Sequence, residues 1–336
     1  MSIRHRPMQQ KDVRECAKIV ASVPSARRIY EDAIGDLHSA WLRLIDCEAK
    51  IAVVFEEVTG TRATICAIGV SVFVQDEFVK ELKARPFWFP AELTRRMQQG
   101  QSPILSERQF RDANSRGGLS MVVWEGRIAP GFEENPEVYR KLANVFLESH
   151  RGFFLKEAIG HHVETVERLQ LVSQIGGKLW DPIAGCYTTA LGTDPEEILK
   201  SPHVLGLSRE EEIRRPGSWM GGLFEYQPPQ FGFSRSEQRL LLLALNGGTD
   251  QELSRQLGIS PFTVKKTWRA IYERVGDSRP ELIPFHSAAE NGTFERGRGK
   301  KQRLIAYLRE HLEELRPISR KLLLQRGAHE RSSQLP

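Results

Sequence analysis

The sequence is poor in cysteine, and the few cysteines are scattered. Its four cysteines lie far apart and form no CxxC pair: Cys16, Cys47, Cys66 and Cys186. A disulfide framework or a structural zinc site needs closer grouping, so neither is indicated. We expect reduced thiols, most of them buried.

Apolar segments of membrane length are also missing. The longest apolar runs, such as Ile51–Phe55 and Ala67–Val74, have the length of strands and fall far short of the ~20 residues of a membrane span. Residues Met1–Gln10 are polar and contain no apolar segment of the kind found in a secretory signal peptide. We therefore expect a soluble, intracellular protein.

The length and overall charge set wide limits. The 336 residues are enough for about two domains, and 40% hydrophobic with 27% charged residues suits a globular protein. The net charge of +5 permits a nucleic-acid partner, but many enzymes are as basic. The distribution of the charges therefore carries more information than their sum.

Residues 1–191 are predicted to form a mixed α/β domain. Helical spacing of apolar residues is found at Lys11–Ser22, Glu137–Ser149 and Thr165–Gly176. Runs rich in β-branched or other apolar residues predict strands, with a hairpin turn at Thr59-Gly60. These strands are Ile3–Arg6, Lys50–Val58, Ala63–Val74, Leu119–Trp124, Phe153–His162 and Cys186–Leu191.

Residues 192–232 are rich in proline and glycine, which break long periodic elements. This segment is predicted to be a linker with one short helix at Pro195–Lys200. A compact helical domain is expected at residues 233–290, followed by a basic helical tail at residues 291–336.

The segment 233–283 carries strong helix-boundary signals. Ser234 with Glu237, and Thr249 with Glu252, have the spacing of capping boxes. Gly258 provides a tight turn, and Ser260 precedes Pro261 at the first position of a third helix. A capped short helix, a glycine turn and a capped longer helix are the parts of a helix-turn-helix.

The third helix is expected to be amphipathic. Val264, Ile271 and Val275 share the face toward the core. Its first two turns then present Thr263, Lys265, Lys266 and Arg269 outward, where long cationic side chains reach phosphates and guanine edges if the helix enters a major groove.

These motifs resemble the LuxR/NarL-type helix-turn-helix of bacterial transcriptional regulators. The matching positions are Phe233-Ser234-x-x-Glu237, Gly247, Thr249-Asp250-x-Glu252-Leu253-Ser254 and Leu257-x-Ile259-Ser260-x-x-Thr263-Val264-Lys265. Ser278-Arg279-x-Glu281-Leu282-Ile283 is similar to the start of the family's fourth helix, which commonly forms the dimer contact. Three features depart from the family: Arg235 stands where Pro is usual, Trp268 is unusually large, and the turn Gly276–Ser278 is one residue shorter.

The resemblance implies a cytoplasmic bacterial regulator that binds double-stranded DNA as a homodimer through the helix 261–274 and associates with the nucleoid when bound. Lys265, Lys266 and Arg269 become candidates for base contacts. Ser260, Thr263 and Lys265 become candidates for positions near phosphates. Neither a cofactor, a metal nor a catalytic residue is implied.

The tail from Asn291 to Pro336 holds eleven Lys or Arg against five Asp or Glu, an excess of six positive charges. This cluster suits additional phosphate contacts. Alternatively, a helix at Gln302–Leu315 packs on a domain or a second subunit through Leu304, Leu308, Leu312 and Leu315. We favour the packing role.

The N-terminal region lacks the acidic set of a phosphoacceptor receiver. Its opening, Ile3-Arg4-x-Arg6-Pro7-x-x-x-x-Asp12-Val13, resembles the first strand and helix of GNAT acetyltransferases, and the later order of elements is compatible with that fold. The family's pyrophosphate loop after the fourth strand does not fit Trp124–Gly131. A degenerate, non-catalytic domain for sensing an unknown small-molecule or protein effector, or for dimerisation, is therefore expected.

The remaining candidate residues give only weak indications of a metal site, a ligand pocket or a catalytic nucleophile. The adjacent His161 and His162 would point to opposite faces of a strand, which disfavours a metal site. The cluster Phe87-Trp88-Phe89 suits a core or interface more than a ligand pocket, and Cys186 has no identified base.

Three functions remain: a DNA-binding regulator, a GNAT-type N-acetyltransferase that carries a helix-turn-helix targeting module, and a protein-interaction scaffold. The missing pyrophosphate loop disfavours the second, and the cationic helix face disfavours the third. We favour the regulator, which is not an enzyme.

Overall fold

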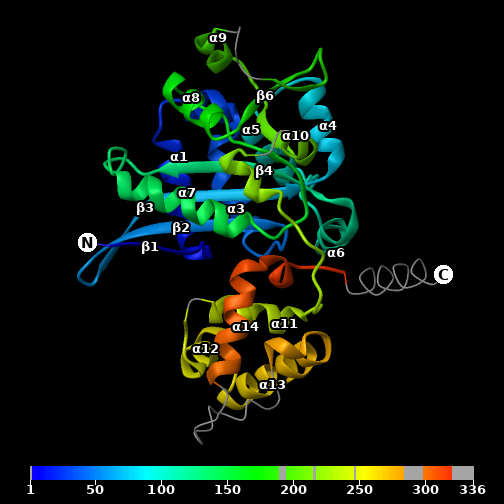
Figure 1. Ribbon diagram of the computed structural model, residues 1–336. Coiled ribbons are helices and arrows are strands. Elements are labelled where there is room, and N and C mark those ends of the chain that lie inside the picture. Colours follow the sequence, from blue (N-terminus) through cyan, green and yellow to red (C-terminus); the bar gives the residue numbers. More distant parts are fainter. Residues whose placement is uncertain (1, 189–193, 215–216, 246, 284–297, 320–336) are drawn as a thin grey trace, which may run out of the picture. The chain divides into compact units, whose positions relative to one another are not determined.

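The computed structural model describes residues 2–188, 194–214, 217–245, 247–283 and 298–319 (Figure 1). The chain forms two compact units, Met1–Phe224 and Glu225–Pro336. The first is built on an eight-stranded sheet with helices packed against it, so the predicted mixed α/β class is confirmed. The described part of the second unit is helical.

The sheet of the first unit has the order β1-β2-β3-β4-β5-β8-β6-β7. All neighbouring strands are antiparallel except β4 and β5, which are parallel. The strands are β1 (Ser2–Pro7), β2 (Lys50–Thr59), β3 (Arg62–Val74), β4 (Leu119–Ile128), β5 (Leu155–Ile159), β6 (Lys178–Asp181), β7 (Cys186–Thr188) and β8 (Leu205–Ser208).

Side-chain alternation along β2 divides the core between the two faces of the sheet. Val54 belongs to the large core and the adjacent Phe55 to a smaller one, because successive side chains of a strand point to opposite faces. Trp41 and Trp124 meet edge to face in the large core, with centroids 6.2 Å apart. Val138 and Val145 of α7 (Pro136–His150) close the smaller one.

The helices of the first unit are distributed between these two cores. The large core takes residues of α1, α2, α3, α4 and α5, while α7 packs on β1, β2 and β3 and crosses the sheet in Figure 1. Their bounds, with the remaining helices, are α1 (Val13–Ala21), α2 (Ala26–Tyr30), α3 (Leu37–Leu44), α4 (Asp76–Ala84), α5 (Phe89–Gln98), α6 (Glu107–Asp112), α8 (Val166–Gln174), α9 (Pro195–Lys200) and α10 (Arg209–Arg214). A 3-10 turn, η4, spans Trp219–Leu223.

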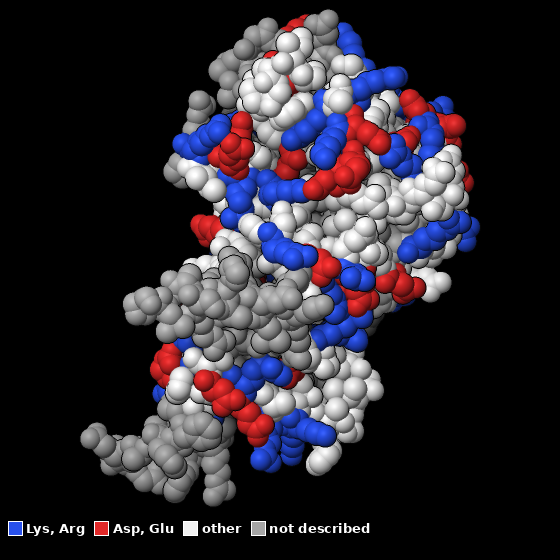
Figure 2. Space-filling model, turned by 90° about the vertical axis from the view of Figure 1, so that its right-hand side faces the viewer, with Lys and Arg blue, Asp and Glu red and all other residues white. Residues whose placement is uncertain are grey.

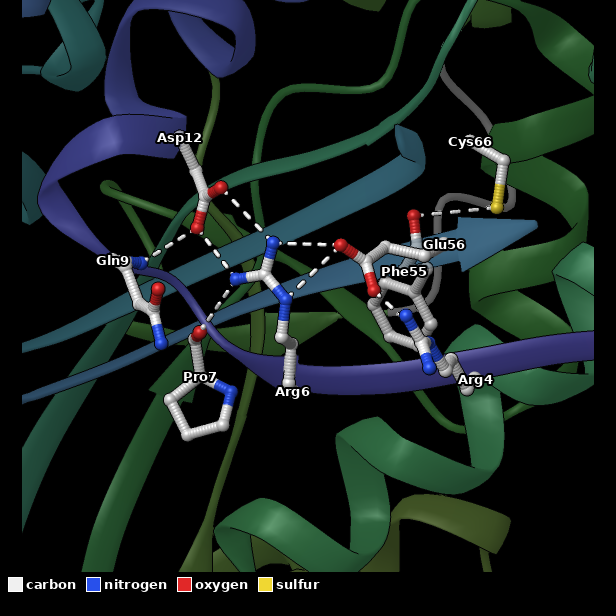
Figure 3. A network of polar contacts seen from close by, with 8 residues as sticks. All are labelled: Arg4, Arg6, Pro7, Gln9, Asp12, Phe55, Glu56 and Cys66. Atoms are coloured by element: carbon white, nitrogen blue, oxygen red, sulfur yellow. Dashed lines mark hydrogen bonds and ion pairs between the residues drawn. The ribbon is translucent and has the colours of Figure 1, made fainter. Parts of the chain in front are cut away.

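Polar contacts of the opening motif Arg4-x-Arg6-Pro7 link β1 to β2 and to the start of α1 (Figure 3). The Arg6 guanidinium donates to both carboxylate oxygens of Asp12, at 2.6 and 3.0 Å, and to Oε1 of Glu56 on β2 at 2.6 Å. Arg4 donates to Oε2 of Glu56 at 3.1 Å. Asp12 also accepts the backbone N–H of Gln9 at 2.8 Å. The motif residues therefore hold β1, the start of α1 and β2 together.

A buried polar network involves the part of β4 that extends beyond its pairing with β5. The two strands pair only from Leu119 to Val122, although β4 continues to Ile128. Arg127 donates to Glu125 at 2.8 Å and pairs with Glu164 at 2.5 Å, and Tyr30 donates to Glu125 at 2.9 Å. Burial works to lower the pKa of Arg127, but the two carboxylates outweigh it, so Arg127 stays charged.

Two boundary predictions for the first unit are wrong. β4 does not end at Trp124, because Glu125, Gly126 and Arg127 pair with β3 and their charges are satisfied inside the unit. Nor are the described residues 194–224 a linker. The helix predicted at Pro195–Lys200 is present as α9, but β8 then lies in the sheet between β5 and β6. Local Pro and Gly content cannot reveal this pairing with distant strands.

The second unit contains α11 (Arg235–Ala244), α12 (Asp250–Leu257), α13 (Pro261–Ser278) and α14 (Arg298–Glu310), with a 3-10 turn at Leu312–Leu315. Leu240, Leu253, Ile271 and Leu308 are among the fully buried residues of its core. None of the helices in the described ranges of either unit has the length and apolar character to cross a membrane.

Candidate nucleic-acid interface

The first three helices of the second unit begin at the caps that the sequence predicts. The Ser234 hydroxyl accepts the N–H of Glu237, whose carboxylate accepts the N–H of Ser234 at 2.6 Å. Thr249 and Glu252 form the same reciprocal pair, with the return bond at 2.7 Å. Each box satisfies N–H groups that a helix start leaves without partners.

The connection from α12 to α13 is a short turn over residues 258–260. Gly258 adopts φ 66°, the left-handed conformation in which a Cβ is strained. The buried Ser254 hydroxyl donates to the Ile259 carbonyl at 2.5 Å and fixes the turn. Ser260 accepts the N–H of Thr263 at 3.1 Å, and Pro261 occupies the first turn of α13. These bonds hold the N-terminal end of α13 in a defined position.

One face of α13 is buried and the other is exposed. Val264, Ile271 and Val275 are buried as predicted, and Trp268 joins them at 5% exposure. The five predicted site residues lie on the exposed side, at or within the first three turns of the helix: Ser260, Thr263, Lys265, Lys266 and Arg269. Spacings of three and four residues bring Thr263 beside Lys266, and Lys265 beside Arg269.

The three cations of this face differ in their surroundings. The Arg269 guanidinium donates to Glu273, one turn further on, at 2.9 Å, although both side chains are more than half exposed. Within the described part of the chain, Lys265 and Lys266 form no ion pair. Figure 2 shows Lys and Arg side chains gathered on the second unit at the level where Figure 1 places α13. The first two turns thus carry uncompensated positive charge.

Sequence reasoning missed one residue of this face. Phe262 is 76% exposed, the most exposed aromatic side chain of the described chain. It lies three residues before Lys265 and four before Lys266, on the same side of α13. An aromatic residue next to the helix-starting Pro261, outside the core spacing of Val264 and Ile271, was the available signal.

The large side chain of Trp268 lies where α14 packs beside α13. Its ring stacks on Tyr272, with centroids 5.6 Å apart, and Lys301 of α14 places its Nζ 5.0 Å from the Trp268 ring. The same Lys301 pairs with Asp250 of α12 at 3.2 Å. The large indole therefore belongs to the contact between α13 and the C-terminal helix.

The helix expected to start at Ser278–Ile283 is limited to one 3-10 turn, Pro280–Leu282. Pro280 lacks an N–H donor and disfavours helical backbone at Arg279, which has φ −139° and ψ 74°. α13 itself runs to Ser278, beyond the predicted end at residue 274. In the described chain, the fourth helix of the unit is α14.

The leucines of the predicted tail face their own unit. Leu304, Leu308 and Leu315 are at most 1% exposed in the core that α11 and α13 share, and Leu312 packs against it. The domain contact foreseen for this helix is confirmed, and a separate tail beginning at residue 291 is wrong for the described residues 298–319. Residues 291–297 and 320–336 lie outside the described ranges.

The other residues singled out from the sequence belong to the first unit. His161 and His162 follow β5 and point to different surroundings: His161 lines a cavity, while His162 is buried against Phe89. Phe89 is fully buried in the core, as expected for the aromatic cluster. Two of the cysteines are buried, Cys16 and Cys66, whereas Cys186 is exposed.

Comparisons with protein-family models, with curated proteins and with solved structures find no match to this chain.

Proposed function

We propose that this chain is a sequence-specific DNA-binding transcription regulator that reads the major groove with α13. The observation that carries the proposal is the exposed, uncompensated Lys265 and Lys266 on the first turns of a helix whose N-terminal end is fixed by the Gly258 turn. An exposed helix end of this kind suits helix-turn-helix recognition, in which the N-terminal residues of the second helix contact base edges.

The exposed side chains divide into two kinds of contact. Lys265, Lys266 and Arg269 have the length and charge to reach guanine edges or phosphates, and Ser260 and Thr263 lie where the helix start meets the backbone. Arg269 must exchange its bond to Glu273 for a base or phosphate. Phe262 offers an apolar surface for a thymine methyl group.

The first unit is proposed to be a non-catalytic, GNAT-like domain. Its antiparallel strands β1 to β4, followed by the parallel pair β4 and β5, support the fold. The loop from β4 to α7 opposes acetyl-CoA binding. The Gly131 N–H there donates to the Glu133 carboxylate at 2.6 Å, and Asn135 caps α7 at the N–H of Glu137 at 3.0 Å. Amides already bonded beside acidic residues do not favour a pyrophosphate.

A homodimer on a palindromic site is also part of the proposal and rests on the family resemblance. The buried leucines of α14 are not available for its contact. A two-fold dimer would place two copies of α13 in successive major grooves, about 34 Å apart.

The test is selection of bound duplexes from a random pool by the purified full-length protein, followed by titration of the enriched site. Lys265→Ala and Arg269→Ala should each weaken binding about 5- to 150-fold, the equivalent of about 1–3 kcal/mol for a good base contact. Arg239→Ala is the matched control, because Arg239 is an exposed cation of α11 in the same unit. It should change affinity little.

Failure to enrich any sequence, or equal binding by all three variants, would contradict direct readout and favour the interaction scaffold.

Equilibrium dialysis against acetyl-CoA tests the acetyltransferase alternative, because it distinguishes a catalytic first unit from a non-catalytic one. No retention is expected, and retention with micromolar affinity would reinstate the enzyme.

A further inference from the structure

The first unit contains a cavity that plays no part in the proposed DNA contact. It has a volume of about 230 Å³ and lies between the sheet and the helical layer formed by α7, α8 and η4. Strands β2, β3 and β4 and the end of β5 form its floor. Trp219 of η4, which is 42% exposed, stands at its edge, so the cavity has a side near solvent.

A pair of glycines on neighbouring central strands creates the hollow. Gly69 of β3 lies opposite Gly126 of β4 in the sheet, and both line the cavity. A Cβ at Gly69 would meet no atom within 4 Å, so this position opens into empty space. Glycine in a strand interior weakens the strand and often marks close approach of a ligand. Here two such positions coincide with the floor of a cavity.

The cavity wall is mainly apolar. Ile51, Val53 and Phe55 of β2 and Leu142 and Phe146 of α7 give it aliphatic and aromatic surface. The wall includes no Lys or Arg among the described residues, and the one carboxylate, Glu125, is already bonded to Tyr30 and Arg127. An ionised ligand would lose its hydration without gaining a counter-ion, which is costly.

His161 supplies a hydrogen-bonding group at one end of the cavity. Its ring lies over Gly126, with Cε1 3.5 Å from the position of a Cβ there. Burial lowers the pKa of His161 to about 3, and nearby Arg127 and Arg168 act in the same direction, so the imidazole is neutral at physiological pH. A neutral imidazole has one donor and one acceptor nitrogen.

We propose that this cavity is a binding site for a small, uncharged and mainly apolar molecule that carries one hydrogen-bonding group, such as a phenol or an indole. A cavity of 150 Å³ accommodates benzene, so 230 Å³ accommodates about ten non-hydrogen atoms. The apolar part lies over Gly69, and the hydrogen-bonding group meets His161, whose ring covers Gly126. The site is independent of whether the chain binds DNA.

The experiment uses 4-fluorophenol as the probe, with its ¹⁹F line width measured as the full-length protein is added. Wild-type protein should broaden the signal at millimolar probe. Gly69→Leu fills the cavity from the sheet and Ala143→Leu fills it from α7, so each should reduce binding at least tenfold. Gly35→Leu is the matched control, because Gly35 is exposed and a Cβ there also meets nothing.

Two further comparisons test the chemistry. His161→Phe should weaken 4-fluorophenol about fivefold, the worth of one net hydrogen bond of about 1 kcal/mol, and leave fluorobenzene unchanged. The anion 4-fluorobenzoate should not bind. Circular dichroism establishes that each variant is folded; if Gly69→Leu is not, Ala143→Leu decides.

No broadening by wild-type protein overturns the proposal. So does broadening that survives in the folded cavity-filling variants, or equal binding of 4-fluorobenzoate. Because the readout involves no DNA, its failure is separate from failure of the proposed regulator.

Discussion

One cation of the first unit and two cations of the second lie in opposite surroundings. In the first unit, Arg127 is 3% exposed and pairs with Glu125 and Glu164. In the second, Lys265 and Lys266 are exposed on the first turns of α13. Buried pairs fix the structure of a protein interior, whereas exposed and unpaired cations remain free for a polyanion. In the first unit the buried cation serves internal structure, whereas under the proposed function the exposed cations of the second unit serve an external partner.

The strongest test of this comparison is to break the buried pair. Arg127→Leu leaves the buried Glu125 and the partly buried Glu164 without their cation, so the first unit should lose about 3–5 kcal/mol of stability. Differential scanning calorimetry of the full chain measures the change. Arg108→Ala is the control, because this side chain is 93% exposed and should leave the transition unchanged. A loss below about 1 kcal/mol in Arg127→Leu would mean that the network does not organise the unit.

The two units also differ in how far their sequences predict them. The caps Ser234, Thr249 and Ser260 and the turn at Gly258 act within four residues, so the starts of α11, α12 and α13 were foreseen. β8 was not, because its four residues depend on pairing with β5 and β6. Caps and turns depend on neighbouring residues and can be recognised in the sequence, whereas the pairing of distant strands cannot.

The difference between local and long-range signals also explains which of the two proposed sites could be predicted from the sequence. The five candidate residues from Ser260 to Arg269 lie within three turns of one another, and the structure exposes all of them. Phe262 was overlooked because an apolar residue is expected to be buried. The cavity required Gly69, Gly126 and α7 to meet, and no spacing in the sequence indicates that they do.

The second unit also contains a buried carboxyl group, that of Glu314, which extends the comparison of the two units. Glu314 is 1% exposed, and its two carboxylate oxygens accept the N–H groups of Gln230 and Phe231 at 2.7 and 3.0 Å. Burial raises its pKa from 4.5 to about 7, and it outweighs the two backbone N–H groups, which act to lower the pKa. The folded state therefore binds this proton more tightly than the unfolded chain does. Its contribution to stability is fully present below pH 4.5 and is lost as the pH rises through about 7.

Glu314→Gln should remove this pH dependence. Relative to wild type, the variant should gain up to about 3 kcal/mol between pH 4.5 and pH 8, the free-energy equivalent of the raised pKa. The hydrogen bond lost with one oxygen lowers stability equally at every pH, so the readout is the difference between pH values. Calorimetry at pH 4.5, 6 and 8 measures it. A constant offset across the series would show that Glu314 does not titrate in this range.

The smallest expected effect is that of an apolar side chain on the exposed face of α13. Phe262 is an apolar residue on the charged face of α13, and at 76% exposure its removal should leave the unfolding midpoint unchanged. Phe262→Ala should weaken the selected DNA site by about 1 kcal/mol, roughly fivefold, if the ring covers a thymine methyl group. Replacing that thymine by uracil in the duplex should weaken the wild-type protein equally and the variant not at all. Equal sensitivity of both proteins to uracil would place the ring away from the base, and the face would then act through charge alone.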